Sequence, residues 1–226
     1  MPRAALCAGD GWGLAMSETR IILVRHGETH WNREARIQGY HANSPLTDTG
    51  IAQARAVAER LADEGIDALY TSDAGRTLQT VEPIAAATGL PVTHETGVRE
   101  RNYGIFEGRT FAEVEQVFPD AFQKYRTRDP HYTIDGGESA VQFRDRIVAA
   151  LAEIARRHAG KRSAVVTHGG VVGAMYRVAL EMPMDAPRVY TTRNASLSCF
   201  RFEAERWVLE VWGDVAHLDG ESLDDE

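Results

Sequence analysis

The chain of 226 residues is poor in cysteine and in long apolar runs, and it has fewer basic than acidic residues. Its two cysteines, Cys7 and Cys199, form no CxxC pair, so neither a disulfide framework nor a structural zinc site is indicated, and a reducing, cytoplasmic setting fits. No apolar stretch approaches the roughly 20 residues that span a bilayer, so we expect no membrane partner. The net charge of −8 argues against a nucleic-acid partner. A cationic pocket for a small anion remains compatible with this charge, because salt screens charges beyond about 8 Å.

The two ends of the chain differ from its centre. We expect residues 1–18 to form a leader without regular structure, because Asp10 and several glycines interrupt it before an apolar signal segment is complete. Residues 219–226 are an acidic tail. Residues 19–218 show no internal repeat and no linker, and we expect them to form a single domain. Met16 lies just before the first expected strand, so translation from Met16 is an alternative to translation from Met1.

Apolar periodicity predicts alternating strands and helices. Short β-branched runs indicate buried strands, and apolar stripes between a Thr or Ser cap and a glycine indicate helices. This order is typical of an α/β fold with a mostly parallel sheet that helices flank on both faces. Two alternating segments near the C-terminus indicate an antiparallel hairpin at the sheet edge. We expect strands at 21–24, 66–72 and 163–170, helices at 47–65 (buried face Ile51, Ala54, Val57, Ala58 and Leu61), 75–89, 139–160 and 171–180, and the hairpin at 196–202 and 207–213.

Polar residues follow three of the expected strands. Arg25 and His26 come directly after the first strand, Arg76 follows the second, and His168 lies at the polar end of the third. In open parallel sheets, ligands bind outside the carboxyl ends of the strands, where side chains and backbone N–H groups converge. We therefore expect two arginines and two histidines to meet at one edge of the sheet, although they lie far apart in the sequence.

The stretch LVRHGETHWN holds two histidines, His26 and His30, four residues apart. A zinc site of the HExxH type needs both histidines on one helix, whereas here the order is HGETH and the motif follows a strand, so no metal site is predicted. A phosphate loop explains more of these residues: Arg25 offers a fork of donors, Gly27 allows close approach of the backbone, and Asn32 can donate from its amide. Neutral His26 would then be a nucleophile toward phosphorus, and His30 a surface residue.

Four motifs together resemble the histidine phosphatase superfamily, in its phosphoglycerate mutase-like branch. They are LVRHGETHWN with IQG after it, SDAGRTLQT, VRERNYG and VVTHGG, and the likeness runs from Ile21 to about His217. The resemblance implies the α/β sandwich of that family, with residues 19–218 as one catalytic domain.

The resemblance also implies roles for individual residues. His26 matches the histidine that accepts the phosphoryl group, and Glu100 matches the acid that protonates the leaving oxygen. Arg25, Arg76 and His168 match the residues that hold the phosphoryl oxygens, which agrees with the charge on those oxygens in a loose transition state. Further positions match residues that line the substrate pocket, and these are Asn32, Gln38, Gly39, Tyr103 and Gly169.

The expected function is a metal-independent phosphomonoesterase that acts on a small phosphorylated metabolite through a phosphohistidine and needs no cofactor. The alternative is a phosphoglycerate mutase, primed by 2,3-bisphosphoglycerate. The resembling mutases carry a longer insertion near residues 105–137, with an adjacent arginine pair and a proline-rich run that this chain lacks. A non-catalytic phospholigand-binding module is a third hypothesis. A homodimer paired through the edge strand at 196–202 is an open alternative to a monomer.

We expect residues 105–137 to form a helical excursion over the pocket that selects the substrate. The segment is rich in aromatic residues and is punctuated by Pro119 and Pro130. Phe111, Phe118 and Phe122 also have the spacing of residues that pack into a core, and both interpretations stay open from the sequence.

Overall fold

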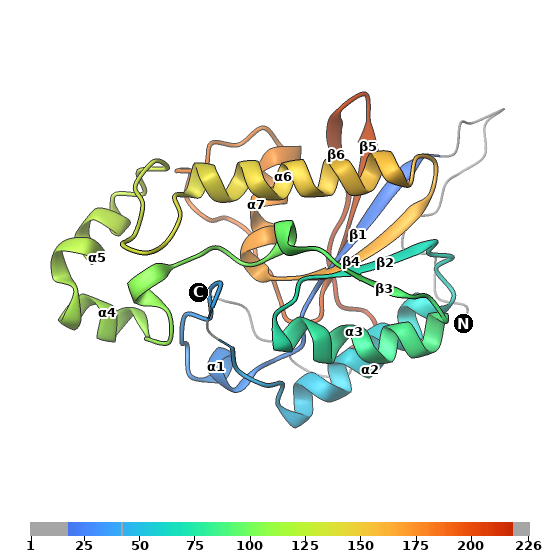
Figure 1. Cartoon of the computed structure of the whole chain (residues 1–226), viewed down its shortest axis with the longest axis horizontal. Coiled ribbons are helices and arrows are strands. Elements are labelled where there is room, and N and C mark those ends of the chain that lie inside the picture. The colour runs from blue at the N-terminus through green and yellow to red at the C-terminus, as the bar shows by residue number, and fades with distance from the viewer. Residues whose placement is uncertain (1–17, 42, 219–226) are drawn as a thin grey trace.

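The protein is described by a computed structural model that covers residues 18–41 and 43–218 (Figure 1). All but the last residue of the expected leader, and the whole of the acidic tail, lie outside the described residues. One six-stranded sheet has the order β3-β2-β4-β1-β5-β6. Its strands are β1 (Thr19–Arg25), β2 (Ala68–Thr71), β3 (Val92–His94), β4 (Arg162–Thr167), β5 (Leu197–Glu203) and β6 (Arg206–Asp214).

The sheet is parallel from β3 to β1 and antiparallel from β1 to β6. This confirms the mostly parallel α/β fold and the antiparallel C-terminal edge hairpin. The predicted edge position of residues 196–202 is wrong, because β5 pairs with β1 on one side and with β6 on the other, so the edge strand is β6. The hairpin turns through Ala204 and Glu205, both with positive φ, which matches the twist of the two strands. Cys199 on β5 is buried.

Helices cover both faces of the sheet (Figure 1). Strand β1 shows why: Ile21 and Leu23 pack under the helices at 140–157 and 169–179, whereas Ile22 and Val24 pack under those at 48–62 and 75–88. Successive side chains of a strand point to opposite faces, so a continuous apolar run serves two cores. The helices are α1 (His30–Arg33), α2 (Asp48–Ala62), α3 (Gly75–Thr88), α4 (Phe111–Val117), α5 (Pro119–Arg126), α6 (Ala140–Arg157) and α7 (Gly169–Ala179), with 3₁₀ turns η1 (Thr96–Val98) and η2 (Gly104–Phe106).

Three predicted helix caps are confirmed, whereas α2 and α6 end at Ala62 and Arg157, before the predicted ends at 65 and 160. Thr47 caps α2, Ser139 caps α6 in a reciprocal pair with Gln142, and Gly89 ends α3 with φ 68°. The predicted inward position of Ile51 is wrong, because its side chain is 40% exposed. The first turn of α2 makes its contact through glycine instead, since a Cβ on Gly50 would lie 2.1 Å from the Glu28 carbonyl oxygen.

The excursion between β3 and α6 is helical, as predicted, and lies beside the sheet (Figure 1). Its helices α4 and α5 share a small core of their own, around Phe106, Val114, Phe122 and Ile134, with Ile37 from the loop after α1. Phe111 and Phe118 pack at the border of this core, so part of the aromatic content is structural. No helix in the described part of the chain is long and apolar enough to cross a membrane.

Candidate active site

The three predicted strand ends meet at one edge of the sheet. Arg25 is the last residue of β1 and His26 follows it, while His168 caps α7 directly after the parallel neighbour β4. The imidazole rings of His26 and His168 lie edge to face with their centroids 5.5 Å apart. Arg76, on the first turn of α3, reaches the same place, because its Nη2 lies 2.9 Å from Nδ1 of His168. The structure thus brings together residues separated by more than 140 positions in the sequence.

His26 is held in one tautomer. Its Nδ1 lies 2.8 Å from the carbonyl oxygen of Gly27, which only accepts, so Nδ1 carries the proton and Nε2 keeps its lone pair. The side chain is buried, and burial lowers its pKa well below the usual value, with further lowering from the Arg76 and Arg25 guanidiniums. A neutral imidazole with a free lone pair can act as a nucleophile at neutral pH.

His168 is neutral for the same physical reasons. Burial is the main cause of its lowered pKa, followed by the charge of Arg76 and then by His26. Arg76 donates to its Nδ1, so Nε2 carries the proton and donates to Oγ of Ser72 at 2.9 Å. The guanidiniums of Arg25 and Arg76, which add to the lowering of both pKa values, contribute a positive potential at this edge of the sheet, and such a potential attracts a tetrahedral oxyanion.

The two arginines are fixed by backbone carbonyls. Arg25 is fully buried and donates from Nη1 to the carbonyl of Thr192, and Arg76 donates from Nη2 to the carbonyl of Gly39 at 3.0 Å. Gly39 has φ 55°, which favours glycine, and a Cβ there would lie 2.2 Å from Oε1 of Glu107, so any other residue would be strained and would displace this side chain. Gly39, a predicted site residue, therefore belongs to the site through its backbone.

Glu100 reaches the site from the segment after η1. Its Oε2 accepts a hydrogen bond from the N–H of Gly170 at 2.9 Å, and its Oε1 accepts one from the N–H of Arg101 at 2.8 Å. Gly170 lies two residues after His168, at the N-terminus of α7, so the carboxyl is close to the histidine pair. The sequence motif named Gly169, which begins α7, but Gly170 makes the contact, and a Cβ on it would lie 2.1 Å from Oε1 of Glu100.

The other predicted site residues, Gln38, Asn32 and Tyr103, have different surroundings. Gln38 is 8% exposed, and its buried Oε1 accepts no hydrogen bond from the described residues, so it is available to a ligand. Asn32 closes the cap of α1, where its Oδ1 accepts from the N–H of Thr29 and from Nδ2 of Asn194. Tyr103 lies beside Tyr125 and packs against the α4–α5 core. His30 is exposed at the start of α1, on the surface, as predicted.

Three further residues of the site are outside the sequence motifs and were not predicted. Ser72 accepts from His168, Oγ1 of Thr80 accepts from the N–H of Gly27 at 3.1 Å, and Nδ2 of Asn194 donates to the carbonyl of His26 at 3.2 Å. Ser72 is the last residue of an expected strand, and Thr80 lies one turn after Arg76, so both positions carried a weak signal. Asn194 carried none, because it contacts the loop only after β5 pairs with β1.

An α/β sheet with paired histidines and buried arginines at its strand ends defines an anion-binding enzyme class. Comparison with known proteins identifies it: a family model described as histidine phosphatase superfamily (branch 1) matches residues 21–215, and the chain belongs to this superfamily. It is accordingly a member of the enzyme family of histidine-type phosphatases and phosphoglycerate mutases.

Individual relatives span most of the chain. Phosphoglycerate mutase-like protein 4 of Arabidopsis thaliana is 40% identical and aligns over 88% of this chain and 86% of its own. YhfR of Bacillus stearothermophilus has a TM-score of 0.78 at 33% identity, covering 88% and 98% of the two chains. A mycobacterial glucosyl-3-phosphoglycerate phosphatase, in complex with VO3, has a TM-score of 0.76 at 30% identity, covering 86% and 98%.

Acid is expected to destabilise the protein through the two buried histidines. Their pKa is lowered in the folded chain, so at a pH below the unfolded value of about 6.5 the unfolded chain binds more protons than the folded chain. The free energy of unfolding therefore decreases as the pH is lowered. Each histidine contributes a loss of up to about 1.4 kcal/mol between pH 7.5 and 5.5. Denaturant titrations at both pH values should show a smaller acid loss in His168→Asn than in wild type. Equal losses would contradict this origin.

Proposed function

We propose that the chain is a metal-independent phosphomonoesterase that acts on a small phosphorylated metabolite through a phosphohistidine intermediate. The observation that carries this proposal is the neutral His26, whose free Nε2 lies in a positive potential set by Arg25 and Arg76. A nucleophile and charge-stabilising donors are thus preorganised in one place, and Glu100 lies at the adjacent helix N-terminus.

The proposed reaction has two steps. Nε2 of His26 attacks phosphorus, the P–O bond to the alcohol breaks, and Glu100 gives its proton to the departing oxygen. Arg25, Arg76 and His168 hold the phosphoryl oxygens, whose charge is spread in a loose transition state. Water then attacks the phosphohistidine, Glu100 takes a proton from this water, and the P–N bond breaks to release phosphate. The cycle returns every group to its starting state and uses no cofactor.

Two observations support a phosphatase over a mutase. A mutase must keep its phosphorylated state from water, which calls for a cover over the site. Here the excursion over residues 105–137 is two short helices with their own core, and it contains no adjacent arginines. The mycobacterial relative is named as a phosphatase of a glycerate-containing phosphoester, which supports a small metabolite as substrate. The plant relative's name keeps the mutase as the second candidate.

Phosphate release in the presence of EDTA tests the proposed function. We expect wild-type enzyme to hydrolyse members of a panel of sugar phosphates, phosphoglycerates and nucleotides, with rates unchanged by EDTA. Rapid quenching of this reaction should trap an acid-labile, alkali-stable phosphoprotein. Interconversion of 2- and 3-phosphoglycerate, primed with 2,3-bisphosphoglycerate and faster than phosphate release, would establish the mutase. Failure to release phosphate from any substrate, or to form a phosphoprotein, would contradict the proposal and leave the phospholigand-binding module.

A further inference from the structure

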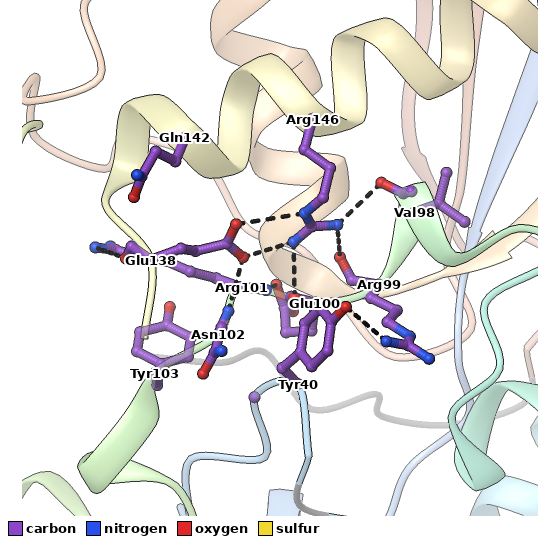
Figure 2. A network of polar contacts seen from close by, with 12 residues as sticks. Tyr40, Val98, Arg99, Glu100, Arg101, Asn102, Tyr103, Glu138, Gln142 and Arg146 are labelled. Atoms are coloured by element: carbon purple, nitrogen blue, oxygen red, sulfur yellow. Dashed lines mark hydrogen bonds and ion pairs between the residues drawn. The ribbon is translucent and has the colours of Figure 1, made fainter. Parts of the chain in front are cut away.

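The segment that carries Glu100 is held in part by an arginine of α6, which lies more than 40 residues later in the sequence. Residues 99–103 follow η1 without regular structure, so their carbonyls and N–H groups depend on partners elsewhere. Arg146, on the second turn of α6, donates from Nη1 to the carbonyls of Gly97 at 2.9 Å and Arg99 at 3.1 Å, and from Nη2 to the carbonyl of Glu100 at 3.2 Å. One guanidinium thus fixes the backbone on both sides of the Arg99–Glu100 peptide bond (Figure 2).

A carboxylate completes this arrangement from the other side. Oε1 of Glu138 accepts from Nη2 of Arg146 at 2.6 Å and from the N–H of Asn102 at 2.8 Å, and its carbonyl accepts from the guanidinium of Arg101 (Figure 2). The side chains of Arg146 and Glu138 are 23% and 16% exposed, so their ion pair is partly shielded from water. The chain before Glu100 is held by Arg146 and the chain after it by Glu138.

We infer that Arg146 and Glu138 are positioning residues for the carboxyl of Glu100, and this inference rests on the proposed role of Glu100 as proton donor. The carboxyl of Glu100 accepts from the N–H groups of Gly170 and Arg101, while Arg146 donates to the backbone that aims this carboxyl. A misplacement of about 1 Å costs about 10²-fold in rate when a reacting group must be oriented. Three carbonyls and a carboxylate also need the planar fork of an arginine, which the ammonium of lysine does not reproduce.

A structural role alone makes a different prediction from a positioning role. A clamp that only stabilises the fold would affect all substrates alike, because the amount of folded enzyme does not depend on the substrate. A residue that aims the proton donor affects only substrates whose leaving group needs a proton. An alkyl phosphate such as glycerol 2-phosphate needs one, whereas 2,4-dinitrophenyl phosphate releases a stable anion. The ratio of kcat/KM for these two substrates therefore isolates the position of Glu100.

We expect Arg146→Met to lower kcat/KM by about 10²-fold for glycerol 2-phosphate and by less than about threefold for 2,4-dinitrophenyl phosphate. Arg146→Lys should give a similar selective loss, and Glu138→Gln a smaller one, which retains a test if the methionine variant folds poorly. Arg144→Met is the matched control, because Arg144 lies on the same helix and pairs with exposed Asp145. Arg144→Met should leave kcat/KM unchanged for both substrates. Circular dichroism spectra check the fold of each variant.

Glu100→Gln separates failure of this inference from failure of the proposed function. Loss of a general acid lowers rates by about 10²- to 10⁴-fold, so Glu100→Gln should lower kcat/KM for glycerol 2-phosphate and not for 2,4-dinitrophenyl phosphate. Adding Arg146→Met to this variant should lower kcat/KM no further. If Glu100→Gln is selective but Arg146→Met and Glu138→Gln lower both substrates equally, the positioning role is wrong and the proposed function stands. If Glu100→Gln itself shows no selectivity, the proton-donor role of Glu100 fails, and the inference fails with it.

Discussion

His26→Ala is expected to lower kcat for phosphoester hydrolysis by about 10⁴-fold or more, the scale seen when a covalent nucleophile is removed. Alanine offers no nitrogen to accept the phosphoryl group, and water at that position is neither oriented nor held in the right protonation state. Initial rates of phosphate release measure the loss. Phosphoprotein trapping should detect an acid-labile adduct in wild type and none in the variant, since the adduct forms on the residue that was removed.

The matched control for His26 lies in the same motif. His30 is four residues later, exposed on the first turn of α1, so His30→Ala should keep its rate within about twofold of wild type, as surface substitutions usually do. His26→Asn is a second variant, whose amide can replace the donor to the Gly27 carbonyl and so preserves the loop. Activity retained in both His26 variants would assign the chemistry to another residue. Equal losses in the His26 and His30 variants would revive a role for the histidine pair.

The convergence of Arg25, His26 and His168 could be predicted because it follows from topology alone. Parallel strands place their carboxyl ends at one edge, so a polar residue after each strand must arrive there, whatever the details of packing. Strand β3 could not be predicted, because Val92–His94 is only three residues long, is largely exposed and is defined by its pairing with β2. Its apolar content is too small to give a periodic signal.

Arg146 and Asn194 could not be assigned from the sequence, for a different reason. Each donates to backbone carbonyls of a segment far away in the chain. Because every residue has a backbone carbonyl, the residue type of the acceptor does not reveal the contact. Arg146 looks like an ordinary arginine on a predicted helix until that helix is placed over residues 97–100. The side chains that touch a ligand leave a motif, whereas those that hold the motif in place are visible only in three dimensions.

Arg76→Met is expected to lower kcat/KM by about 10³-fold, within the range for loss of an arginine that stabilises a transferring phosphoryl group. The guanidinium is 1% exposed and joins the Gly39 carbonyl to His168, so its removal takes away both a donor for phosphoryl oxygens and the support of the second histidine. Its charge also lowers the pKa of His26 and His168. The pKa of both should therefore rise in Arg76→Met, which NMR titration of the imidazole protons measures.

Arg76→Lys separates charge from geometry. Lysine keeps the positive charge, so the pKa of the two histidines should stay low, but a single ammonium cannot reach the Gly39 carbonyl, His168 and a phosphoryl oxygen with the geometry of a planar fork. Its rate should therefore lie between those of wild type and Arg76→Met. A fully active Arg76→Lys would show that charge alone is required. The opposite result would be an Arg76→Met variant that keeps kcat/KM within tenfold of wild type and leaves both pKa values unchanged. Burial and the charge of Arg25 would then be what keeps His26 neutral, and Arg76 would only join the Gly39 loop to α7.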